Sequence, residues 1–268
     1  MRRTATAVAW LALVASLAAC GSVTHGASGT GATSSPTPKD PKAVLVASTP
    51  TTAGGTFQVT AKQAAIDESG TVDPAGRKLD LRIVTVQTQD KMTITVSLEF
   101  LVADGKVWLK ATIKAPKGTA GLPKLPTKWM LLDPTKLDGG YKDMLQFDNP
   151  DPTDVSTLLQ GLVSAQETGT GQYRGTIDLT RATGQSALDA AAVTALGDAA
   201  KALPFTATLD DKARMTAFTM TIPAAGSTPA STYTATFSDY GGAPALAAPV
   251  AGESQTAPAV VYSMLAGS

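Results

Sequence analysis

An alternation of apolar and polar residues that begins at position 92, with apolar even positions as far as 102, constrains the fold of this chain more than any other feature. Threonine, serine and glutamate occupy the odd positions from 93 to 99, and every even position is apolar. These even positions are Met92, Ile94, Val96, Leu98, Phe100 and Val102. Because neighbouring side chains of a β-strand point to opposite faces, the pattern predicts a strand with one apolar and one solvated face, as in antiparallel sheets.

Weaker alternation predicts further strands on both sides of this one. The patterns around Phe57–Val59 and Leu79–Ile83 lie before it, and Lys106–Ile113 comes directly after it. Asp73-Pro74-Ala75-Gly76 and Asp104-Gly105 have the composition of tight turns between these strands. Later segments with strand-like composition are Tyr173–Thr180, Pro204–Asp210, Arg214–Ile222 and Thr232–Tyr240. About eight strands are therefore expected.

Helical periodicity interrupts the strands in two or three places. Between Val155 and Val163 apolar residues recur at intervals of three and four, behind Asp151-Pro152-Thr153-Asp154, which has the composition of a helix N-terminus. A second helix is expected over Ser186–Ala202 and a weaker third one over Pro134–Gln146. This order of elements predicts an α+β fold, in which a long curved antiparallel sheet has helices covering its concave face.

The N-terminus has the organisation of an export signal. Arg2 and Arg3 precede the apolar stretch Val8–Leu17, which is about half as long as a membrane-spanning helix. The stretch ends in Leu17-Ala18-Ala19-Cys20, which resembles the lipobox of bacterial lipoprotein signals. An ordinary secretory signal would leave a cysteine in no special place, whereas the single cysteine of this chain stands where a lipobox needs it. We therefore expect removal of residues 1–19 and a lipid on Cys20, which anchors the chain to the outer face of the cell membrane.

Composition divides the remainder of the chain. Residues 20–53 are rich in Gly, Ser, Thr, Ala and Pro and have no apolar period, which is typical of a flexible tether, with one turn of helix over Ala43–Ala47. Residues 54–249 hold the predicted strands and helices and form one domain, and residues 250–268 are expected to be a loosely packed C-terminal tail. Without the two arginines of the signal, 20 basic residues face 22 acidic ones, which gives no electrostatic basis for binding nucleic acid.

The chain offers little for catalysis. Its only histidine, His25, falls in the expected tether, which excludes a Ser-His-Asp or Cys-His arrangement within the domain. Zinc sites draw mainly on histidine and cysteine, and the domain has neither. The acidic pairs Asp67-Glu68 and Asp210-Asp211 are interpreted as solvated residues beside turns. We expect no enzymatic activity, no metal and no cofactor.

Five short segments, together with the lipobox, carry a resemblance to a known family. They are Asp104–Lys110, Lys128–Asp133, Tyr173–Leu179, Leu203–Asp210 and Phe237–Gly241. In their order and spacing, which extend over most of residues 54–249, the chain resembles the LppX/LprAFG family of actinobacterial envelope lipoproteins. The resemblance implies a fold similar to that of the lipoprotein carriers LolA and LolB, a half-barrel sheet closed by helices.

The resemblance also implies a function, because members of this family hold the acyl chains of lipids or glycolipids in an apolar cavity between sheet and helices. The corresponding cavity candidates here are Met92, Ile94, Val96, Leu98, Phe100, Leu158 and Leu162. From the residues alone, the same apolar faces can instead close into a packed core. The alternative is therefore a surface sensor or interaction lipoprotein with a filled core. Expected partners are the membrane through Cys20, a lipid or glycolipid ligand, and an export partner protein.

Overall fold

The computed structural model describes residues 40–89, 92–137, 147, 149–182, 184, 188, 190–226 and 229–266. The expected signal over 1–19, Cys20 and the tether as far as residue 39 lie outside this described part. Among the helices that the structure does describe, none is long and apolar enough to cross a membrane.

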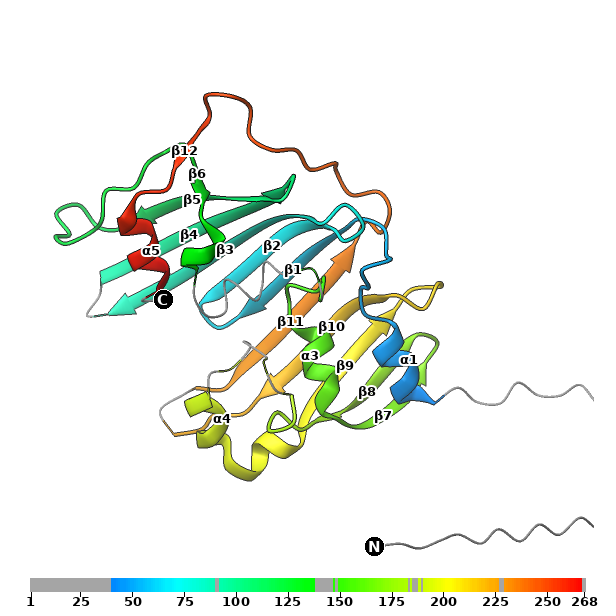
Figure 1. The fold of residues 1–268 in the computed structure, drawn as a ribbon. Coiled ribbons are helices and arrows are strands. Elements are labelled where there is room, and N and C mark those ends of the chain that lie inside the picture. The colour runs from blue at the N-terminus through cyan, green and yellow to red at the C-terminus, as the bar shows by residue number, and fades with distance from the viewer. Residues whose placement is uncertain are drawn as a thin grey trace, which may run out of the picture. The chain divides into compact units, whose positions relative to one another are not determined.

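The described strands form one large curved sheet whose two edges do not meet (Figure 1). Twelve strands lie in the order β12-β6-β5-β4-β3-β2-β1-β11-β10-β9-β8-β7. Neighbouring strands are antiparallel except β12 and β6, which are parallel. The strands are β1 (Phe57–Gln63), β2 (Ile66–Asp73), β3 (Lys78–Gln89), β4 (Met92–Ala103), β5 (Lys106–Lys114), β6 (Trp129–Leu132), β7 (Leu162–Gly169), β8 (Gln172–Ile177), β9 (Leu203–Leu209), β10 (Met215–Ile222), β11 (Ser231–Ser238) and β12 (Ser254–Thr256).

Strands from opposite ends of the chain meet in the middle of this sheet. Figure 1 shows β1, in blue to cyan, directly beside β11, in orange. The hydroxyl oxygens of Thr60 and Thr236 are 2.6 Å apart across this pair. The pairing therefore joins the N-terminal and C-terminal strands into one continuous surface.

The strongest sequence pattern is confirmed by β4 and β5. They are joined at Asp104 and Gly105, whose φ angles of 51° and 69° both lie in the left-handed region. A two-residue hairpin turn of this kind needs positive φ at both central positions, which asparagine, aspartate and glycine accept most readily. The sequence patterns do not predict β2, β6, β7 or β12, so the sheet is larger than the eight strands expected.

The helix expected over Ser186–Ala202 is confirmed as helical from Ala190 to Lys201, whereas the helix expected over 155–163 is shorter than predicted. The described helical segments are α1 (Pro41–Ala47), η1 (Pro134–Lys136), α3 (Val155–Leu158), η2 (Leu159–Gly161), α4 (Ala190–Leu196), η3 (Gly197–Lys201) and α5 (Ala259–Ala266). The helix expected over 155–163 ends at Gly161, because Leu162 begins β7 and pairs with Ile177. Of the third expected helix, the structure describes only η1, and residues 138–146 lie outside the described part.

Both flanks of the expected domain are packed against it. In α1 the side chain of Leu45 is completely buried, and the helix lies against β7 and η2. At the other end β12 pairs with β6, and α5 buries Val261 and Leu265. The amide of Asp133 donates a hydrogen bond of 2.9 Å to the hydroxyl of Tyr262 in α5. The segment expected to be a loose tail thus extends the sheet and contributes to the core.

Candidate functional site

The even positions of β4 define one face of the sheet, which we call the inner face. At its packed end, Phe100 lies opposite Leu81 of β3 and Leu109 of β5, and all three side chains are fully buried. They belong to an apolar cluster that continues across the sheet to Phe218 of β10. The inner face therefore carries the main core of the protein.

Burial decreases along this face toward one end of the sheet. On β4 the exposed fraction of the residue rises from 0% at Phe100 to 39% at Met92, and on β2 it rises from 1% at Val72 to 43% at Ile66. Both strands are antiparallel to β3, and their exposed residues lie toward the same end of it. The greater exposure is therefore shared by several strands at this end of the sheet and is not a property of one side chain.

Five apolar side chains occupy this exposed end of the inner face, and we call the region that they form the open end. They are Ile66, Met92, Ile94, Val96 and Ile113. Thr85 of β3 lies opposite Ile66 of β2 on one side and Val96 of β4 on the other. Val96 in turn lies opposite Ile113 of β5, so these residues form one row across four strands. A row of aliphatic side chains that continues from a fully buried core into solvent can accept further apolar groups without rearrangement of the sheet.

The structure brings only some of the seven predicted cavity residues together. Leu98, Phe100 and Leu158 share one buried cluster, and Val96 and Leu162 pack on its margin. Leu162 lies in β7 and not, as predicted, on a helix.

Met92 and Ile94 belong to the open end, where the Sδ atom of Met92 is 3.8 Å from the hydroxyl of Thr119. Two pockets in the described part of the chain are lined by residues other than these seven.

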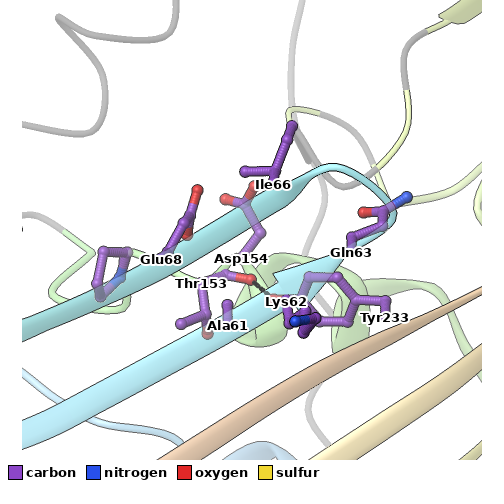
Figure 2. A pocket seen from close by; sticks show the side chains of 9 residues that line it. Ala61, Lys62, Gln63, Ile66, Glu68, Thr153, Asp154 and Tyr233 are labelled. Carbon is purple, nitrogen blue, oxygen red and sulfur yellow. Dashed lines mark hydrogen bonds between the residues drawn. The ribbon is translucent and has the colours of Figure 1, made fainter. Parts of the chain in front are cut away.

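The first pocket lies beside the open end and is acidic (Figure 2). Its volume is about 350 Å³ with the space at its mouth included. We call it the acidic pocket, and its lining residues are Ala61, Lys62, Gln63, Ile66, Glu68, Pro152, Thr153, Asp154 and Tyr233. Figure 2 shows the carboxylates of Glu68 and Asp154 on the same side of β1 and β2. Ile66 belongs both to this pocket and to the open end, so the two features are continuous.

Strand register explains why there is room for the pocket. Glu68 of β2 lies opposite Ala61 of β1, and Ala61 lies opposite Ala235 of β11. Two small side chains in one row leave space above the sheet. The segment before α3 fills part of this space, because Tyr233 of β11 donates a hydrogen bond to the carbonyl oxygen of Thr153.

Asp151 organises that segment, which we call the Asp151 loop (149–156). Its Oδ1 accepts hydrogen bonds from the amide of Thr153 at 2.9 Å and from the hydroxyl of Thr153 at 2.5 Å. Its Oδ2 accepts from the amide of Ser156 at 2.8 Å. Asp154 precedes α3 with a φ of 61° and makes no side-chain cap, so Asp151 satisfies the first turn of the helix from five residues away.

Burial and like charge perturb the carboxyl groups of the pocket. The pKa of Glu68 is raised from 4.5 to about 7, mainly by burial and further by the negative charges of Asp154 and Asp151. Burial also raises the pKa of Asp151, although its hydrogen bonds from Thr153 and Ser156 act in the opposite direction. Burial, with Asp151 nearby, raises the pKa of Tyr233. The pocket therefore disfavours negative charge on Glu68.

Glu68 is the functional candidate that sequence reasoning missed. The sequence pattern predicts that Asp67 and Glu68 are solvated residues beside a turn, but both lie within β2. Asp67 does face solvent, where its Oδ1 is 3.1 Å from Nζ of Lys62. The signal that could have found Glu68 is its two-residue spacing from Ile66, which places both on the same face of a strand.

The second pocket lies between the 47–55 segment and the end of β11. Its most polar lining residue is Arg214, whose guanidinium is 4.4 Å from the ring centroid of Tyr240. Two nitrogens of Arg214 donate to Oδ2 of Asp210 at 2.8 and 2.6 Å. The charge of Arg214 is thus neutralised within the fold, which favours a structural role for this pocket.

Comparison with known proteins adds no relative to this description. No family model matches the chain, and no curated protein or solved structure matches it significantly. Over the residues that the structure describes, no three histidine, cysteine, aspartate or glutamate side chains are grouped so that they could hold a metal ion.

Proposed function

We propose that this chain is a non-enzymatic carrier that binds the acyl chains of a lipid or glycolipid at the open end of the inner face. The observation that carries the proposal is the gradient of burial on β4, from 0% exposed at Phe100 to 39% at Met92, on a strand whose inner positions are all apolar. The expected resemblance to the LppX/LprAFG family points to the same ligand.

The energetics of apolar burial support this ligand. Each methylene removed from water contributes about 0.8 kcal/mol, so a chain of about 16 carbons contributes roughly 12 kcal/mol before the cost of association. That cost is about 4–15 kcal/mol, so two acyl chains suffice for stable binding without specific polar contacts. In this proposal helices cover part of the concave face, and the acyl chains lie on the inner face beside Val96 and Ile94.

The N-terminal segment completes the proposal. Removal of residues 1–19 and acylation of Cys20 would hold the carrier on the outer face of the cell membrane. The anchor would keep the open end close to the bilayer from which lipid is taken. An export partner protein would then receive the lipid.

Native mass spectrometry tests the proposal on the mature chain, residues 20–268, with Cys20→Ser to prevent acylation. The expected result is co-purified lipid, and uptake of a fluorescent acyl lipid by the delipidated protein. Val96→Trp fills the open end and is expected to lower uptake at least tenfold. Thr95→Trp is the matched control, because it adds the same ring at the next position of β4, on the opposite face.

The sensor alternative predicts a different outcome. A filled core would give neither co-purified lipid nor uptake, and Val96→Trp would behave like Thr95→Trp. Equal uptake in the two tryptophan variants would contradict the assigned face even if lipid is bound elsewhere.

A further inference from the structure

The Asp151 loop is positioned to control access to the inner face. It leads directly into α3, where Val155 and Leu158 are completely buried in the main core. The hydrogen bond from Tyr233 to the carbonyl of Thr153 fixes the loop to β11. Any change that displaces the loop therefore also weakens the packing of α3 against the sheet.

Glu68 lines the acidic pocket together with Thr153 and Asp154 of this loop. Among the residues that the structure describes, the charged or titratable groups that line the acidic pocket or act on the pKa of Glu68 are Asp151 and Asp154 of the loop, Tyr233 of β11 and Lys62 of β1. Lys62 is the only basic residue among the nine that line the pocket, and its Nζ is paired with Asp67. A charge on Glu68 would thus face two carboxylates of the same sign in a partly buried site.

We infer that Glu68 and the Asp151 loop form a proton-operated gate, in which a neutral Glu68 seats the loop and α3 on the sheet and an ionised Glu68 loosens them. The gate is a property of the chain itself. Its consequence, faster release of acyl chains as the pH rises, rests on the proposed function.

The direction and size of the effect follow from proton linkage. Opening the loop removes the carboxylates of Asp151 and Asp154 from Glu68 and exposes Glu68 to water, which returns its pKa toward 4.5. Opening then becomes up to tenfold easier for each pH unit between about 4.5 and 7 and levels off above that range. Over this whole range the equilibrium constant for loop opening can increase by about 300-fold at most. Between pH 5 and 7 we expect it to increase at least tenfold, because part of the shielding of Glu68 from water persists in the open form.

Hydrogen exchange measures the opening directly in the mature chain that carries Cys20→Ser. The reporting amides are those of Ser156 and Leu158, which donate to Asp151 Oδ2 and to the carbonyl of Asp154 at 2.8 Å each. After correction for the intrinsic pH dependence of exchange, their protection is expected to fall at least tenfold from pH 5 to pH 7. The amide of Leu109, in the packed end of the sheet, serves as the internal reference.

Glu68→Gln keeps the shape of the side chain and removes its charge. The contribution of Asp151 is present in both proteins, so the difference between them isolates Glu68. We expect the variant to retain most of its protection at pH 7, while Glu253→Gln, which changes an exposed glutamate beside β12, retains the wild-type response. A wild-type protection that does not change with pH, or a Glu68→Gln slope equal to that of the wild type, would overturn the gate.

A release assay separates the gate from the proposed function. The probe is a diacylglycerol with one pyrene-labelled acyl chain, which has no titratable group of its own. Release from the wild-type protein is expected to be at least threefold faster at pH 7.5 than at pH 5.5, and release from Glu68→Gln to be equally slow at both. Failure of the probe to bind at any pH refutes the carrier but leaves the exchange result to decide the gate, whereas binding with pH-independent exchange refutes the gate alone.

Discussion

Replacing Glu68 with glutamine is expected to stabilise the protein at neutral and alkaline pH and to leave its stability unchanged at acidic pH. In the folded protein the pKa of Glu68 is about 7, whereas its ordinary value is 4.5. The folded state therefore binds more protons than the unfolded state between these values, so stability is greatest below about pH 4.5 and decreases as the pH rises to about 7. The rise in the pKa of Glu68 from 4.5 to about 7 corresponds to a loss of about 3.4 kcal/mol at most in the free energy of unfolding. Because Glu68 is only partly buried, we expect about 2 kcal/mol.

Equilibrium unfolding in urea, followed by circular dichroism, measures this difference. At pH 8 the variant should unfold with about 2 kcal/mol more free energy than the wild type, which is equivalent to roughly 4–8 °C in the melting temperature of a domain this size. At pH 4 the two proteins should be equal, since Glu68 is then neutral in both states. Asp80 and Asp151, whose pKa values are also raised, are present in both proteins and cancel from the comparison. A stability difference that is the same at pH 4 and pH 8 would refute the reasoning, because it would reflect packing and not charge.

Three further predictions test other parts of the structure. Phe100→Ala removes a fully buried ring from the packed end of the inner face and should lower the free energy of unfolding by about 3–5 kcal/mol; a loss below 1 kcal/mol would show that this end is not packed. Tyr233→Phe removes the hydrogen bond to Thr153 and should cost about 1 kcal/mol and accelerate amide exchange at Ser156 at every pH; unchanged exchange would mean that this bond does not hold the loop. Cys20→Ser should abolish incorporation of labelled palmitate and release the protein from the membrane fraction, and retained label would place the lipid elsewhere.

The sequence predicts a strand best where every residue follows the alternation. β4 does so from Met92 to Phe100, and the turn at Asp104-Gly105 fixes its partner β5. In β2 the inner positions are Ile66, Glu68, Gly70 and Val72. A charged residue and a glycine in the middle interrupt the apolar period, although the backbone pairs continuously with β1 and β3. Pairing with two neighbours holds the strand, and that interaction is not visible in the local sequence.

The expected helix over 155–163 illustrates a different limit. Val155, Leu158, Leu159 and Leu162 match helical spacing, but a short apolar run fits a helix and a buried strand equally well. The backbone leaves the helix after Gly161, where an added Cβ would collide with the carbonyl oxygen of Asp178. The close approach of these two chain segments lets Leu162 begin β7. This approach depends on the tertiary structure and is not visible in the local sequence.

The open end and the acidic pocket are expected to act together. Ile66 and Glu68 are two residues apart on β2, so an apolar side chain and an acidic side chain lie next to each other on the same face of the sheet. An acyl chain that extends along the row of Ile66 and Val96 would exclude water from the neighbourhood of Glu68. Exclusion of water favours the neutral carboxyl group, and a neutral Glu68 favours the seated loop. Ligand binding and proton binding should therefore reinforce each other, and by linkage a bound lipid should shift the pH dependence of loop exchange toward higher pH.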